Sequence, residues 1–124
     1  MPYDDLTRKL GPLEFTRITV ATFSSRSALL YVLARNNPGR RITLPPIDFT
    51  RREVYLVAAG PRSSTGYDLR IVAVRDEGDR ILVTVHERTP SLGDPVHARI
   101  TYPFRLIAFL RNGKPVKLKW PGRP

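Results

Sequence analysis

Short apolar runs separated by turn residues dominate the second half of the chain, and this pattern predicts a protein built mainly from β-strands. The run at 53–59 is apolar at most positions, which predicts a central strand covered on both faces. The run at 80–88 alternates strictly, and alternation predicts one buried face carrying Ile81, Val83 and Val85. Further strands are predicted at 68–75, 96–102, 104–110 and 115–120.

The first half of the chain predicts one strand and one helix. Residues 13–23 are rich in Phe, Ile, Thr and Val, which favours a strand. Residues 24–39 begin with serines that can cap a helix and end in Asn-Asn-Pro-Gly, so we expect the helix there, with a strand as the alternative. The proline-containing stretch that follows predicts an extended connection packing Ile47 and Phe49 onto the core.

These elements predict a mainly β, single-domain β-sandwich or half-open barrel, with one short α-helix after the first strand. A chain of 124 residues can bury a core without the help of a metal or a disulfide. We expect an N-terminal lead-in at 1–12, the β domain at 13–120 and a C-terminal tail at 121–124.

Composition narrows the range of functions. Cysteine is absent, which excludes disulfides, thiolate nucleophiles and cysteine-bound zinc. The net charge of +10 favours an anionic partner, although the arginines recur along the whole chain and solvated strand faces would also explain them. No apolar run is long enough to predict a transmembrane segment. The start contains aspartates instead of an export signal, so we expect a cytoplasmic protein if Met1 is the true start, and an extracytoplasmic one if a signal was removed.

Residues 60–67, Gly-Pro-Arg-Ser-Ser-Thr-Gly-Tyr, connect two predicted strands. A phosphate-binding P-loop is excluded, because Gly66 is followed by tyrosine and a strand instead of lysine and a helix. The hydroxyl residues would need a base to act as nucleophiles, and they lack the surroundings of a nucleophile elbow. We interpret the segment as a turn in which Gly66 adopts a backbone angle that other residues resist, while Tyr67 begins the next strand and buries its ring.

The order of turn residues from 54 to 110 resembles the C-terminal domain of the protease complex subunit PrcB. The residues that carry this resemblance are Gly60, Ser64, Thr65, Gly66, Tyr67, Pro90, Thr101 and Pro103. Many family members have a second glycine before the tyrosine, where this chain has Thr65. The resemblance implies a non-catalytic accessory domain with no catalytic residues, cofactor or metal, whose partner is another protein, such as a protease. The turn is also similar to a loop of immunoglobulin-like cysteine protease inhibitors, which leaves an inhibitor-like domain as a further alternative.

Two histidines and an acidic cluster are candidates for a metal or catalytic site. His86 and His97 would face the same way if Val85 paired with Ala98, but two histidines among cationic neighbours make a poor zinc site. Asp76, Glu77 and Asp79 are interpreted as a turn between strands.

The C-terminal strand offers a nucleic-acid-binding module as the alternative function. Its basic and aromatic residues, Lys114, Lys117, Lys119, Trp120 and Arg123, would suit an anionic partner if the ring were exposed to stack on bases. An ordinary edge strand explains the same pattern, with Trp120 pointing inward and the lysines outward. The pair Asn112-Gly113 predicts a tight hairpin before this strand. The oligomeric state is left open by the sequence.

Overall fold

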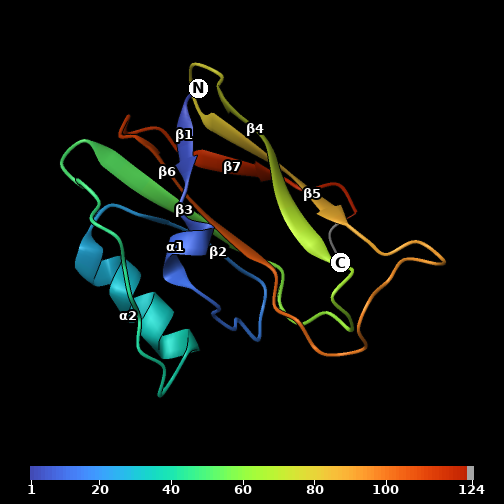
Figure 1. Cartoon of the computed structure of the whole chain (residues 1–124). Helices are drawn as coiled ribbons and strands as arrows, with labels where there is room; N and C mark the ends of the chain where they lie inside the picture. The colour runs from blue at the N-terminus through green and yellow to red at the C-terminus, as the bar shows by residue number, and fades with distance from the viewer. Residues whose placement is uncertain (123–124) are drawn as a thin grey trace.

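The computed structural model describes residues 1–122 and confirms a mainly β fold of sandwich type, without a closed barrel. Figure 1 shows the elements, which are β1 (Tyr3–Asp5), α1 (Thr7–Leu10), β2 (Thr19–Phe23), α2 (Arg26–Asn36), β3 (Arg52–Ala58), β4 (Asp68–Asp76), β5 (Ile81–Arg88), β6 (Phe104–Leu110) and β7 (Val116–Lys119). Within the described residues, no helix is long and apolar enough to span a membrane.

Two sheets make up the sandwich. The four-stranded sheet has the order β1-β6-β3-β2 and is antiparallel throughout. The three-stranded sheet has the order β4-β5-β7, in which β4 and β5 form an antiparallel hairpin and β7 runs parallel to β5. The acidic segment after β4 closes the hairpin, as predicted, through the bond from Glu77 N to Arg80 O of 2.9 Å.

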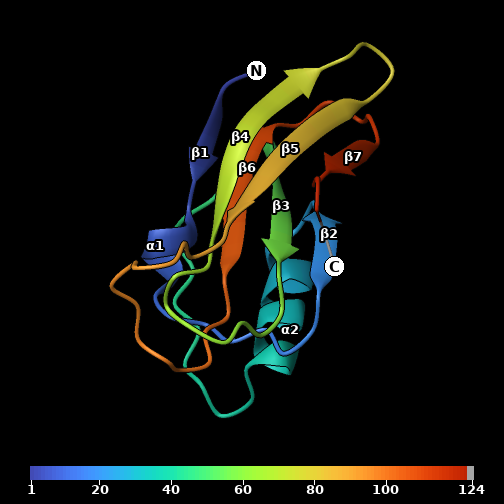
Figure 2. The same cartoon turned by 90° about the vertical axis from the view of Figure 1, so that its right-hand side faces the viewer.

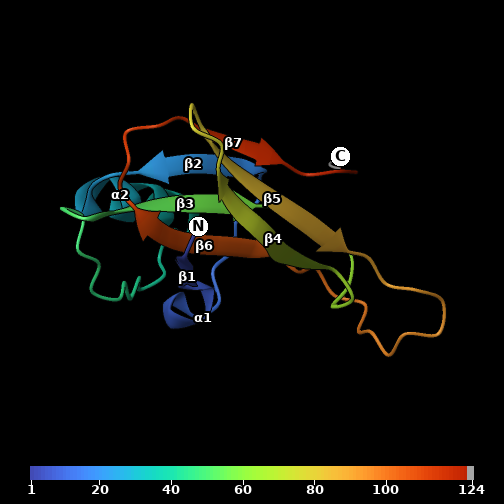
Figure 3. The same cartoon turned by 90° about the horizontal axis from the view of Figure 1, so that it is seen from above.

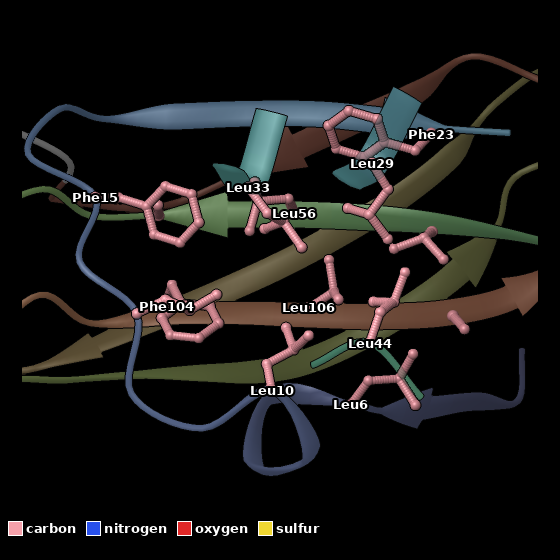
Figure 4. Close-up of a cluster of buried hydrophobic side chains, with 14 residues drawn as sticks. Leu6, Leu10, Phe15, Phe23, Leu29, Leu33, Leu44, Leu56, Phe104 and Leu106 are labelled. Atoms are coloured by element: carbon pink, nitrogen blue, oxygen red, sulfur yellow. The ribbon is translucent and has the colours of Figure 1, made fainter. Parts of the chain in front are cut away.

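The four-stranded sheet carries a hydrophobic cluster on each of its faces. One cluster lies between the two sheets and includes Tyr55, Val57 and Ile107. The other lies against α1, α2 and the connection before β3, and includes Leu10, Leu29, Leu56 and Leu106 (Figure 4). Figure 2 shows the resulting order of layers, with α2 on one side of β3 and β6 and the β4–β5 hairpin on the other. The prediction that the run at 53–59 is a central strand covered on both faces is therefore confirmed.

Helix α2 forms where the sequence predicts it. Ser25 caps its first turn, with its side chain accepting a hydrogen bond from Ala28 N at 3.2 Å. Leu29 and Leu33 are fully buried against the four-stranded sheet. The structure adds two elements within residues 1–12, which were predicted to be a lead-in. Strand β1 pairs with β6, and the single-turn helix α1 buries Leu10 in the same cluster.

The strand predicted at 13–23 is shorter in the structure. Of residues 13–23, only those of β2 pair with a neighbour, namely β3. Leu13 and Phe15 are nevertheless buried, so their apolar character reflects core packing by an irregular segment. Ile47 and Phe49 pack against the same cluster from the connection before β3, as predicted.

The strand predicted at 96–102 is absent, and residues 89–103 form a loop instead (Figure 3). In the described structure only Thr101 of this segment makes a β-bridge, to Arg62. The physical reason is that both edges of β5 are already occupied, by β4 and by β7. The predicted pairing of Val85 with Ala98 is therefore wrong, and Val85 pairs with Ile71.

The predicted hairpin before the last strand is also wrong. Gly113 has a φ of +70° and makes a turn, but β6 and β7 belong to different sheets. The turn carries the chain from the four-stranded sheet to the three-stranded one, where Val116 pairs with Ile81. Strand β7 thus shields the side of β5 that β4 leaves open.

Candidate functional site

Two loops meet at one end of the sandwich, residues 59–67 after β3 and residues 89–103 before β6, and we call them the loop pair. A bridge joins them, in which Arg62 N donates to Thr101 O at 2.8 Å and Thr101 N donates to Arg62 O at 2.9 Å. Thr65 N donates to His97 O at 3.1 Å, and His97 N donates to Thr65 Oγ1 at 2.8 Å. The loop pair contains all eight residues that carry the family resemblance. Tyr67 is the last residue of the first loop, because β4 begins at the next residue, Asp68.

Gly66 allows the two loops to approach closely. A Cβ atom at this position would lie 2.5 Å from Pro90 Cβ and 2.7 Å from Val96 Cγ1. Gly66 does not have a positive φ, so the prediction of a special backbone angle is wrong there. That angle occurs instead at Gly60, with a φ of +81°. The glycine before the tyrosine is therefore needed for space.

The hydroxyl residues of the turn are used in hydrogen bonds that hold the loop pair together. Ser64 is buried, and its Oγ accepts a hydrogen bond from Gly66 N at 3.2 Å. Thr101 Oγ1 donates to Ser64 O at 2.8 Å, which ties the second loop to the first. Tyr67 is half-buried, less than predicted. Pro103 contributes its carbonyl oxygen to Ala59 N at 2.9 Å, at the base of the loop pair.

An ion pair that sequence reasoning missed anchors the first loop to β5. Arg62 Nε donates to Glu87 Oε2 at 2.5 Å and its Nη2 donates to Oε1 at 3.0 Å, so the guanidinium grips both carboxylate oxygens. Only 14% of the Arg62 side chain and 10% of the Glu87 side chain are exposed. The hydrogen bond to Glu87 raises the pKa of Arg62 above its ordinary value, so its charge is permanent. The sequence contained one indication of this ion pair. Glu87 follows Val83 and Val85 at the alternate positions of β5 that point inward, and a charged side chain there needs a partner.

The second loop presents apolar side chains to solvent. Leu92 is fully exposed, and Val96 and Ile100 are 39% and 59% exposed. Two open depressions border the loop. One of about 430 Å³ lies between the Thr65–Tyr67 turn and Val96, and another of about 380 Å³ lies beside Ile100. The second loop thus carries three exposed apolar side chains, with one hollow beside Val96 and another beside Ile100.

The residues of the basic C-terminal candidate are divided by the structure. Trp120 is buried between the sheets, as the inward alternation predicts, so its ring is not on the surface to stack on a base. Lys114 Nζ binds Asp76 at 2.7 Å, and this bond lowers the pKa of the aspartate. Lys117 and Lys119 are exposed on β7. Arg123 and the end of the predicted tail lie outside the described residues.

The two histidines do not come together through a hairpin. His86 lies opposite Arg70 in the β4–β5 pair, while His97 lies in the second loop and bonds through its backbone. Within residues 1–122, no group of three or more His, Asp or Glu side chains is placed to hold a metal ion. In the same residues, the hydrogen bonds of Ser64 and Thr65 are made to backbone groups and not to an imidazole.

Comparison with protein families gives one match. Residues 54–109 match the family model described as PrcB C-terminal. The match begins at the third residue of β3, ends one residue before the end of β6 and includes the whole loop pair. Comparisons with curated proteins and with solved structures gave no match.

Proposed function

Because residues 54–109 match the family model described as PrcB C-terminal, we propose that this chain is a non-catalytic accessory domain. The proposed partner is another protein, a protease, which binds through the loop pair. The family connects the domain with a protease complex. The family match covers the loop pair and the two strands, β3 and β6, that hold its base. The proposal assigns the contact to the part of the chain whose residues carry the family resemblance.

The observation that carries this proposal is the exposure of Leu92, Val96 and Ile100 on one loop. The three side chains lie within nine residues of one loop, and exposed apolar patches are typical of surfaces that bind a partner. An apolar side chain buried at an interface stabilises a complex by roughly 1.5–3 kcal/mol. A partner that covers this loop would therefore gain most from these three side chains.

The hydrogen bonds between the loops support the same proposal. A loop held in one conformation loses little conformational entropy when it binds. Thr65, Thr101 and Arg62 fix the second loop to the first, and Arg62 fixes the first to the sheet. The apolar side chains are thus presented from a preorganised backbone.

A capture experiment with matched variants tests the proposal. The protein would be immobilised, incubated with an extract of the source cell, and the retained proteins identified by mass spectrometry. The test variant is Leu92→Ser with Ile100→Ser, and the control is Val72→Ser with Leu110→Ser, which removes two other exposed apolar side chains of the three-stranded and four-stranded sheets. We expect a protease to be retained by the native protein and the control, and lost from the test variant.

Two results would contradict the proposal. One is a set of captured proteins that contains no protease. The other is a protease that is retained equally by the test variant, which would place the contact elsewhere on the molecule. Circular dichroism and melting temperature must be the same for both variants, since all four side chains are exposed.

A further inference from the structure

The outward face of the three-stranded sheet concentrates basic side chains. Alternation on β5 turns Ile81, Val83 and Val85 inward, so that the residues between them face out. The register of the sheet then gives the outward neighbours. Two rows cross all three strands from β4 through β5 to β7, and they are Arg75, Leu82 and Lys117, and Ala73, Thr84 and Lys119. Two further rows cross β4 and β5 only, and they are Arg70 with His86 and Asp68 with Arg88.

We call this surface the basic face, and its cations are Arg70, Arg75, Arg88, Lys117 and Lys119. All five are exposed, and within the described residues none of them has an ion pair. The acidic residue on this face, Asp68, is bound to Arg105 at 3.4 Å. The charge is therefore less evenly spread than the sequence indicates, because other basic residues such as Arg62 and Lys114 are paired with carboxylates.

The cations are arranged over an area and not along a line. Arg70 and Arg75 lie on β4, while Lys117 and Lys119 lie on β7, so the two rows are separated by the width of β5, which places them roughly 10 Å apart. The strip between the rows is the outward face of β5, where Leu82 and Thr84 are half-buried and are followed by the exposed His86 and Arg88. Val72, at the bulge of β4, is 57% exposed.

A single strand of nucleic acid would meet one row of these cations, whereas a planar anionic surface can meet both rows together. Among the described residues of the basic face there is no Phe, Tyr or Trp, so it offers no such ring for stacking of single-stranded bases. The exposed Val72 would gain no favourable contact from the phosphates of a nucleic acid. At a bilayer surface the same side chain can contact lipid at the headgroup level.

From this geometry we propose that the basic face binds the surface of a bilayer that contains anionic lipids. The inference rests on charge and arrangement and is independent of the proposed protease partner. Cations within a Debye length of an anionic leaflet are attracted to it, and each contributes about a fivefold gain in binding. Five of them on one face are enough for reversible association that salt weakens.

The test is sedimentation with vesicles of phosphatidylcholine and phosphatidylserine in equal parts, compared with vesicles of phosphatidylcholine alone. The test variant, Arg75→Gln with Lys117→Gln, removes one cation from each row. The matched control, Arg8→Gln with Lys9→Gln, makes the same change in net charge on the exposed side of α1. Helix α1 packs on the face of the four-stranded sheet that points away from the three-stranded sheet, so these two residues are remote from the basic face. We expect the native protein to sediment with the anionic vesicles only, and the test variant to bind them roughly 30-fold more weakly. The control should lose less than about fivefold.

Three results would overturn the proposal. The first is an absence of binding to the anionic vesicles at low salt. The second is an equal loss in the test variant and the control, which would mean that net charge acts without regard to the face. The third is tighter binding to duplex DNA at the same ionic strength, lost in the test variant, which would assign the basic face to nucleic acid.

Discussion

At the scale of single residues, Gly66 is constrained by its neighbours across the loop pair. Its missing side chain leaves room for Pro90 and Val96, which belong to the other loop. Gly60 is a different case, because its φ of +81° disfavours any residue with a Cβ atom. Two glycines of one loop are thus required for two separate physical reasons.

We predict that Gly66→Ala lowers the free energy of unfolding by roughly 1–3 kcal/mol, because the added methyl group overpacks the contact with Pro90 and Val96. Adding Val96→Ala to this variant should restore part of the loss, which urea denaturation of the single and double variants would measure as a double-mutant cycle. Gly60→Ala serves as the control, since backbone strain is not relieved by Val96→Ala. Additive losses in the Gly66 pair would show that the two residues do not compete for space.

Glu53 is a buried carboxylate in β3. Asn112 Nδ2 donates to its Oε1 at 3.4 Å, and burial raises its pKa above the ordinary value of 4.5, against the opposing charge of Arg111. The folded protein therefore holds this proton more tightly than the unfolded chain does. Stability falls as pH rises through the interval between 4.5 and the folded-state pKa.

We predict that Glu53→Gln raises the melting temperature at neutral pH and leaves it nearly unchanged below the ordinary glutamate pKa of 4.5, because the amide stays uncharged. Thermal unfolding followed by circular dichroism over this pH range would measure the difference. The exposed Glu14, which pairs with Arg40, provides the control variant Glu14→Gln, for which no gain at neutral pH is expected. A Glu53→Gln variant that is less stable than the native protein at neutral pH would refute the argument.

At the scale of elements, the local pattern of apolar and polar residues predicted the type and position of several strands and of helix α2. The strictly alternating β5, the doubly covered β3 and the capped helix α2 all follow from side-chain periodicity and from Ser25. The choice of strand partner does not follow from periodicity, because it depends on which edges other strands have already filled. Residues 96–102 alternate like a strand, but β5, the partner expected for them, is already paired on both sides, and β7 belongs to the other sheet from β6.

The candidate site shows the same limit. The turn residues from Gly60 to Tyr67 marked the first loop correctly, because glycine and hydroxyl residues have strong local preferences. The bond between Arg62 and Glu87 joins residues 25 positions apart, and it could not be assigned before the fold was known. The hydrogen bonds from the second loop to Ser64 and Thr65 likewise depend on tertiary structure.

At the scale of the whole molecule, the basic side chains fall into two groups, those paired with carboxylates and those without an ion pair. Ion pairs with Glu87, Asp76 and other carboxylates neutralise part of it locally. The basic face retains unpaired cations on a sheet, with Trp120 buried on the inner side. We expect such a surface to attract any polyanion electrostatically. We do not expect it to recognise a base sequence, because contacts to phosphates carry no sequence information.

We predict that duplex DNA binds only non-specifically, with a dissociation constant of roughly 10⁻⁴ to 10⁻⁶ M near physiological salt. Fluorescence anisotropy with several unrelated duplexes over a range of salt concentrations would measure this. Changing Lys117 and Lys119 to alanine should alter the affinity for all duplexes alike. A tight complex with one sequence, abolished by that change, would instead favour the nucleic-acid-binding alternative.

Strands β3 and β6 belong to both hydrophobic clusters, since their side chains alternate between the space under the helices and the space between the sheets. Neither cluster can therefore come apart while the other stays intact, because the shared strands supply a wall to each. We expect the two clusters to be lost together in one cooperative transition, without a stable half-folded intermediate. The amide protons of β3 and β6 should then exchange with solvent only through global unfolding, long after those of the edge strands β1 and β2.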